Sequence, residues 1–199
     1  MYTVIGSLKS RALRVAWMLE ELGQPYTVTP LLPRDAKLAA INPSLKVPVL
    51  KDGEDYVIDS VAICQYLADK HGALTFPAGT IARAHQDSFT QFAMDDVESC
   101  LWTSAKHTFV LPPELRIADV QRACRYDFDR AMGFLAERLG TKTYVMGETF
   151  TVPDLLLGHC SLWAARTGFT IPDGPVSAYM ARIRARPAAM RAIEARKAA

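Results

Sequence analysis

The segment Asn42-Pro43-Ser44-Leu45-Lys46-Val47-Pro48-Val49-Leu50 indicates how the first part of this chain folds. It joins a polar turn to an apolar strand through the Val47-Pro48 bond, and an X-Pro bond adopts the cis form at modest energetic cost. A cis bond would turn the chain sharply, so that the N–H and C=O groups of Val47 face outward. These two groups could then hold an extended peptide by main-chain hydrogen bonds.

A helix start follows this segment. An Asp52-Gly53 turn and the apolar pair Val57-Ile58 lead to Asp59 and Ser60, where helical spacing begins. The free N–H groups and the hydroxyl at a helix N-terminus suit a ligand carboxylate, and the Asp59 carboxylate suits a ligand ammonium. Together with the preceding segment, these groups predict a pocket for a small zwitterionic peptide. The alternative for Asp59 and Ser60 is a helix cap without a ligand.

The predicted elements around this segment occur in the order of a thioredoxin-like domain. A strand at 2–5, a helix at 11–22 and a strand at 26–29 form a unit whose two strands should be parallel. The expected elements that follow are a short helix at 35–41, two strands at 48–51 and 56–58 around a hairpin turn, and a helix at 60–71. This domain should occupy residues 1–76.

Helical spacing dominates the rest of the chain. We expect a linker at 77–84 and an all-helical domain over 85–199, so the predicted fold class is α/β followed by all-α. A long helix should end at Pro112-Pro113, and a helix from Leu155 is apolar almost all round, which predicts a buried centre. Thr151-x-x-Asp154 before it is a capping box, which we assign to folding and not to chemistry.

The composition restricts the classes of protein. Among 199 residues, 50% are hydrophobic and 22% are charged, which is ordinary for a globular protein. The formal net charge of +2 gives no argument for a nucleic-acid or anionic membrane partner. No apolar run approaches the roughly 20 residues of a membrane span, and the first residues lack a signal-peptide pattern, so we expect a cytoplasmic protein.

The cysteines and histidines give no metal pattern. Four cysteines lie far apart without a C-x-x-C pair, which predicts buried free thiols and argues against a zinc ribbon. His107 has no partner at ligand spacing. The sequence therefore predicts no metal cofactor.

Three segments, in this order, resemble the cytosolic glutathione transferases. Lys46-Val47-Pro48 with Asp59-Ser60 resembles the glutathione-binding residues, 10–23 resembles the first helix, and 150–154 resembles the helix cap of the second domain. The resemblance spans nearly the whole chain and is strongest to bacterial-type members with a serine in the loop after the first strand. It implies a thioredoxin-like domain followed by a helical bundle, glutathione as co-substrate, and a homodimer.

The resemblance also implies roles for single residues. Lys46, Val47, Pro48, Asp59 and Ser60 would bind glutathione, with Lys46 at the carboxylate of its glycine end. An ordinary loop lysine is the alternative for Lys46.

The loop after the first strand carries the candidate catalytic residues. A free thiol has a pKa of about 8.5, so an enzyme that uses glutathione as a nucleophile must stabilise the thiolate. A hydroxyl donor and the positive end of a helix serve this purpose. Ser7 matches the position used in the theta-like branch, whereas Ser10 resembles a Ser-Arg-Ser-x-Arg pattern and stands at the predicted N-cap. We favour Ser10 and keep two alternatives, namely Ser7 and neither serine, in which case Ser10 is a structural N-cap. Arg11 and Arg14 add positive charge.

The implied function is transfer of glutathione in detoxification. The thiolate would attack a small hydrophobic electrophile or reduce a hydroperoxide. Trp102, His107 and Phe109 are candidates for the electrophile pocket, with domain core as the alternative. A non-catalytic binding or regulatory protein of the same family, and a glutathione-dependent isomerase or dehalogenase of the same fold, remain alternatives.

Overall fold

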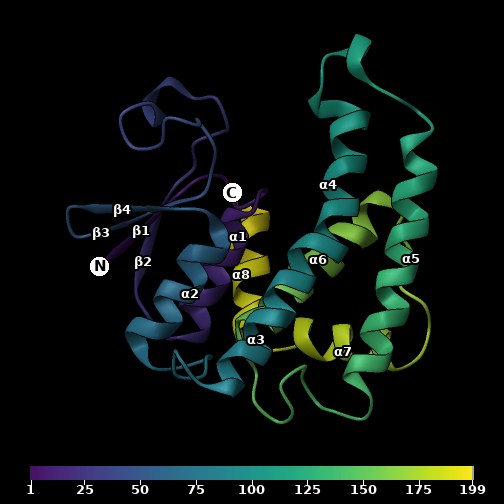
Figure 1. The fold of residues 1–199 in the computed structure, drawn as a ribbon. Coiled ribbons are helices and arrows are strands. Elements are labelled where there is room, and N and C mark those ends of the chain that lie inside the picture. The colour runs from purple at the N-terminus through teal and green to yellow at the C-terminus, as the bar shows by residue number, and fades with distance from the viewer. Residues whose placement is uncertain (199) are drawn as a thin grey trace. The chain divides into compact units, whose positions relative to one another are not determined.

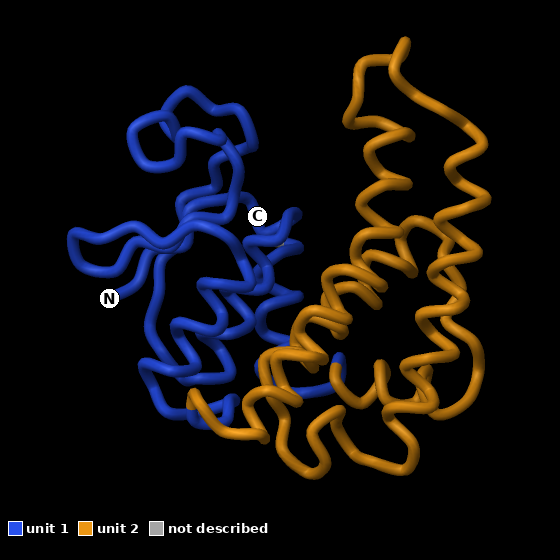
Figure 2. The backbone as a smooth tube through the Cα atoms, viewed as in Figure 1, with its two compact units in different colours: residues 1–77, 184–199 blue, residues 78–183 orange. Residues whose placement is uncertain are grey.

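The computed structural model describes residues 1–198, which form two compact units (Figure 1 and Figure 2). The first unit combines residues 1–77 with the stretch that begins at Arg184, and the second is Ala78–Ile183. The first unit is a small sheet with helices and the second is entirely helical, which confirms the predicted fold class. No helix among the described residues is long and apolar enough to cross a membrane.

A four-stranded sheet forms the centre of the first unit. Its strands are β1 (Tyr2–Ile5), β2 (Tyr26–Thr29), β3 (Val49–Asp52) and β4 (Asp55–Ile58). They lie in the order β2-β1-β3-β4, with β1 and β2 parallel and the other two pairs antiparallel. The parallel pair follows from the helix between the two strands, because parallel neighbours need a crossover connection.

Three helices belong to the first unit, namely α1 (Ala12–Glu21), α2 (Ser60–His71) and α8 (Pro187–Ala198). Because α1 packs against α2, β1 and α8, all of its residues from Ala12 to Leu19 are buried. Arg186 donates from Nε and Nη2 to the two carboxylate oxygens of Glu21, each at 2.7 Å. This grouping by packing differs from the predicted division, which assigns 85–199 to one helical domain.

The segment between β2 and β3 covers the face of the sheet that carries Ile5 and Val49. Leu38 is fully buried against these two side chains. It lies in η1 (Ala36–Leu38), a single 3-10 turn capped by the Asp35 carboxylate. The helix predicted over 35–41 is therefore shorter than expected.

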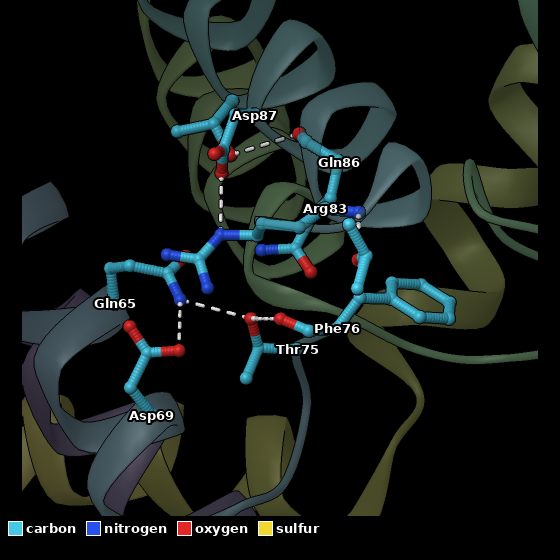
Figure 3. Close-up of polar contacts among 9 residues, drawn as sticks. Gln65, Asp69, Thr75, Phe76, Arg83, Gln86 and Asp87 are labelled. Atoms are coloured by element: carbon cyan, nitrogen blue, oxygen red, sulfur yellow. Dashed lines mark hydrogen bonds and ion pairs between the residues drawn. The ribbon is translucent and has the colours of Figure 1, made fainter. Parts of the chain in front are cut away.

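Gln65 secures the chain where it leaves α2. Its Nε2 donates to Asp69 Oδ1 at 3.1 Å and to Thr75 Oγ1 at 2.9 Å (Figure 3). Gly72 ends the helix with φ of +60°, the left-handed conformation that a glycine adopts without a Cβ clash. The chain after α2 is thus tied back to the helix.

The second unit is a set of packed helices. They are α3 (Ile81–Phe92), η2 (Ala93–Glu98), α4 (Ser99–Ala105), η3 (Lys106–Val110), η4 (Pro113–Leu115), α5 (Val120–Leu139), α6 (Val152–Thr167) and α7 (Pro175–Arg184). The elements from α3 to η3 follow each other directly, so the predicted long helix before Pro112 is present. Its segments η2 and η3 are π-helical, a geometry that is rare and often lies at functional sites.

The start of α6 is held by a buried carboxylate. Asp154 Oδ2 accepts hydrogen bonds from the Thr151 N–H at 2.8 Å and the Thr151 hydroxyl at 3.0 Å. Its Oδ1 accepts from the Val145 N–H at 3.0 Å and the Tyr179 hydroxyl at 2.7 Å. Burial raises the pKa of Asp154, while these hydrogen bonds oppose that change. The predicted capping box is confirmed, and the structure adds two further donors to it.

Candidate functional site

The candidate loop, the peptide edge and a helix start meet at one end of the first unit. Ile5 pairs with Val49 across the antiparallel strands β1 and β3, so the residues after β1 lie opposite those before β3. Near the start of α1, Arg14 donates from Nη1 to Ser60 Oγ at 3.2 Å, which joins the first turns of α1 and α2. The architecture therefore brings the sequence-predicted residues of this unit together.

Val47 presents its peptide group at this end. The Val47-Pro48 bond is cis, which confirms that prediction, and Pro48 is buried. Within residues 1–198, no hydrogen bond involves the N–H or C=O of Val47. A Cβ atom on Gly6 would lie 2.9 Å from Val47 Cβ, and Gly6 has φ of +139°. Only glycine allows the end of β1 to approach Val47 so closely.

Asn42 shapes the loop that carries Lys46. Its buried side chain donates from Nδ2 to the Lys46 carbonyl at 2.8 Å. Its Oδ1 accepts from the Ser44 N–H at 3.1 Å and from the Ser44 hydroxyl at 2.8 Å. These bonds fix the backbone and leave the Lys46 side chain exposed. The contact of Lys46 with a ligand carboxylate stays a prediction.

Asp59 caps α2 from an unusual backbone conformation. Its Oδ1 accepts from the Val61 N–H at 2.8 Å and the Ala62 N–H at 3.1 Å. The φ of +72° is uncommon for a residue other than glycine; such strain costs on the order of 1–3 kcal/mol and clusters at ligand sites. The residue is exposed, and Oδ2 accepts no hydrogen bond within the described residues. Asp59 is thus a helix cap with one oxygen left for a ligand.

Arg14 is a fully buried arginine beneath Ser60. Arginine is almost never fully buried unless it is paired. Since Arg14 supplies the hydrogen to Ser60 Oγ, the Ser60 hydroxyl keeps its own proton for a ligand. The Cys64 thiol donates to the Arg14 carbonyl at 3.7 Å, and burial raises the pKa of Cys64 to about 12, with Arg14 acting in the opposite direction. From the sequence, Arg14 is expected to add charge at the catalytic loop, and its contact with Ser60 is not predicted.

Ser7 and Ser10 belong to one tight turn before α1. The Ser10 hydroxyl donates to the Ser7 carbonyl at 2.7 Å and accepts from the Ala12 N–H at 3.2 Å. The hydroxyl proton of Ser10 is therefore used in a hydrogen bond within the turn. Ser7 Oγ accepts from the Lys9 N–H at 3.3 Å and donates no hydrogen bond within residues 1–198. Arg11 follows at the N-cap position of α1.

The candidate electrophile residues lie in the second unit. Trp102, in α4, is half-buried and packs edge-to-face on Trp163 with ring centroids 6.5 Å apart. His107 Nδ1 accepts from the Ile117 N–H at 3.1 Å, and Phe109 is 64% exposed. Their role in an electrophile pocket stays a prediction. Among the described residues, no group of three or more His, Cys, Asp or Glu side chains could hold a metal ion.

Two family models match the chain. The model for the N-terminal domain of glutathione S-transferase matches residues 5–75, and the model for the C-terminal domain matches residues 101–187. The chain belongs to the glutathione S-transferase family. The first match contains the four-stranded sheet with α1 and α2, and the second contains most of the helices from α4 to α7.

Individual relatives agree with this assignment. Glutathione S-transferase theta-3 of Mus musculus is 28% identical over 145 residues, which are 67% of this chain and 55% of that protein. Glutathione S-transferase 1 of Schizosaccharomyces pombe is 32% identical over 123 residues, which are 58% of this chain and 52% of that protein. The chain thus spans about half the length of these two relatives.

A solved structure shows the same fold. It is the glutathione transferase URE2P6 from Phanerochaete chrysosporium in complex with oxidized glutathione. The TM-score is 0.85 at 22% sequence identity, and the alignment covers 99% of this chain and 96% of the other.

Proposed function

We propose that this chain is a glutathione transferase of the serine-loop branch, which binds glutathione at the end of the first unit and activates its thiol. The observation that carries this proposal is the peptide group of Val47, which has no internal hydrogen bond among the described residues. It lies at the same end of the sheet as the start of α2, because Val49 pairs with Ile58. A peptide ligand needs such an edge, and a charged end needs such a helix start.

The polar groups suit the charges of glutathione. The α-carboxylate of the ligand accepts from the hydroxyl and the N–H of Ser60, since the Val61 and Ala62 N–H groups already donate to Asp59. The α-ammonium donates to Asp59 Oδ2, the main chain pairs with Val47, and Lys46 meets the glycine carboxylate. Pro48, which follows Val47 through the cis bond, is buried. Each ligand charge then has an opposite charge or an ionic hydrogen bond, the kind that contributes most to affinity.

The geometry supports Ser7 over Ser10 as the donor to the sulfur. The Ser10 hydroxyl donates to the Ser7 carbonyl, so Ser10 would have to break this hydrogen bond of the turn before it could donate to the sulfur. The Ser7 proton has no such partner among the described residues. The start of α1, with Arg11 beside it, adds positive potential to either serine. This proposal reverses the preference drawn from the sequence.

The test is a titration of bound glutathione, followed by the ultraviolet absorbance of its thiolate. We expect the pKa of the bound thiol to lie below its value in water, and a pKa lower by one corresponds to about 1.4 kcal/mol in favour of the thiolate. Ser7→Ala should return the pKa part of the way, because the helix end remains. Ser10→Ala is the matched control and should have the smaller effect.

Two outcomes would contradict the proposal in different ways. A larger pKa change in Ser10→Ala would make Ser10 the donor. A thiol that titrates in the wild type as it does in water would show a binding protein without thiolate activation, and the non-catalytic alternative would replace the enzyme.

We further propose that the thiolate acts on a small hydrophobic electrophile bound near Trp102, His107 and Phe109, in a cytoplasmic homodimer that serves detoxification. Assays with glutathione and an aryl halide, a hydroperoxide or a disulfide would separate transfer from reduction. Turnover only with a halogenated or isomerisable substrate would favour the dehalogenase or isomerase alternative. Sedimentation equilibrium would test the dimer.

A further inference from the structure

Two of the four buried cysteines lie at facing positions on α4 and α5 in the second unit. These helices pack against each other, and the chain reverses direction between them (Figure 1). The Ser104 hydroxyl donates to Gln121 Oε1 at 2.6 Å, and Gln121 Nε2 donates to the Ser104 carbonyl at 3.0 Å. This double hydrogen bond fixes which residues of the two helices lie opposite each other.

Cys100 and Cys124 stand one turn further along from that contact. Cys100 precedes Ser104 by one helical turn, and Cys124 follows Gln121 by nearly one turn. Residues three or four positions apart share a helix face. Because the helices are antiparallel, counting back on α4 and forward on α5 moves in the same direction along the interface. This count places Cys100 and Cys124 at the same level on the facing sides of α4 and α5.

The electrostatics of the two thiols supports this placement. Burial is the largest cause of a raised pKa at both Cys100 and Cys124. The exposed carboxylate of Asp127 raises the pKa of each thiol further, and Cys124 also raises the pKa of Cys100. Both sulfurs thus lie within electrostatic range of one surface carboxylate, and Cys100 is within range of Cys124.

Access distinguishes this pair from the other cysteines. Cys100 is 6% exposed and Cys124 is 5% exposed, whereas Cys64 and Cys160 are 0% and 1% exposed. All four cysteines are buried, and those of the α4/α5 pair are the least completely covered.

We propose that Cys100 and Cys124 form a redox-modification site, which a glutathione disulfide oxidises to an intramolecular disulfide between α4 and α5. The thiolate of one cysteine attacks a sulfur of the oxidant, whose S–S bond breaks to release one glutathione thiolate. The other cysteine, as thiolate, attacks the protein sulfur of this mixed disulfide and releases the second glutathione. The protein loses two electrons and two protons, and the oxidant gains them as two glutathione thiols.

The raised thiol pKa values set the rate of this reaction. Only the thiolate attacks, so below its pKa the rate should rise about tenfold per pH unit. The reaction needs no glutathione site in the first unit. Its failure would therefore leave the proposed transferase function untouched, and failure of that function would leave this site untouched.

The experiment is thiol mapping of the folded full chain. The protein is incubated with oxidised glutathione at pH 8, alkylated, digested without reductant and analysed by mass spectrometry. We expect the intact mass, measured before alkylation, to fall by two hydrogen atoms. A peptide pair linked through Cys100 and Cys124 should appear after digestion. Cys64→Ser is the matched control and should keep the link.

Single variants report the intermediate. Cys124→Ser should stop at one glutathione adduct on Cys100, and Cys100→Ser should stop at one adduct on Cys124. The proposal is overturned if the wild type forms no linked pair, keeps a stable glutathione adduct, or forms the link only in denaturant. The wild-type result decides the question even if a variant fails to fold.

Discussion

Replacing Asp154 with alanine should leave three buried hydrogen-bond donors without an acceptor. The Val145 N–H, the Thr151 N–H and the Tyr179 hydroxyl all donate to this carboxylate. The three residues are 1%, 0% and 0% exposed, so water cannot take the place of the lost oxygens. The Thr151 hydroxyl is a fourth donor, but it can turn toward another acceptor.

The loss in free energy of unfolding follows from the number of buried donors that lose their acceptor. A buried donor left without a partner costs about 1–3 kcal/mol, so three of them cost at least about 3 kcal/mol. A whole domain is stable by only about 5–15 kcal/mol. Thr151→Ala keeps its N–H bond to Asp154 and loses only the hydroxyl, so it should cost about 0.5–2 kcal/mol.

Urea unfolding, extrapolated to water, measures both variants. Glutathione affinity per folded molecule should stay unchanged in each, since Asp154 lies in the second unit and the proposed binding groups lie in the first. A loss in Asp154→Ala no larger than that in Thr151→Ala would refute the reasoning. So would a selective loss of turnover in protein with a normal free energy of unfolding.

Three further changes test the first unit. Asp59→Ala should weaken glutathione binding by about 1.5–3 kcal/mol in calorimetry, the range for a charged hydrogen bond, and an unchanged affinity would remove Asp59 from the site. Arg14→Met and Ser60→Ala should each weaken binding, but together by less than the sum, because Arg14 acts through Ser60; additive losses in the double variant would contradict this. The Cys64 thiol keeps its proton in the native state up to a pKa of about 12, against an ordinary value of 9.0, so the free energy of unfolding should fall as pH rises above 9. The slope should approach about 1.4 kcal/mol per pH unit and should flatten in Cys64→Ala, and equal slopes in both proteins would show that another group is responsible.

Elements with local signals are predicted well from the sequence. The helix α2 begins at Ser60 and ends at His71 as expected, because Asp59 caps its first turn and Gly72 closes its last. The strands around the Asp52-Gly53 turn and the capping box of α6 are predictable for the same reason. Each of these features depends on residues within a few positions of one another.

Features that join distant parts of the chain are not predicted. Arg14 and Ser60 are 46 positions apart, and nothing in the first helix shows that its arginine points at the second. The sequence does not show that the missing side chain of Gly6 makes room for Val47. The direction of the Ser10 hydroxyl depends on the turn geometry at Ser7, which no pattern of residue types specifies.

The packing of α8 on α1 has a consequence for synthesis on the ribosome. The sheet, α1 and α2 are made first, but the ion-pair partner of Glu21 is Arg186, 165 positions later. At about 5–20 residues per second, the residues of the second unit alone occupy roughly 5–20 s. Throughout that interval the face of α1 that α8 will cover stays open. A nascent chain arrested before Arg184 therefore carries a sheet domain in which α8 does not yet cover α1. The first and last parts of the sequence can complete their shared packing only after α8 has been made.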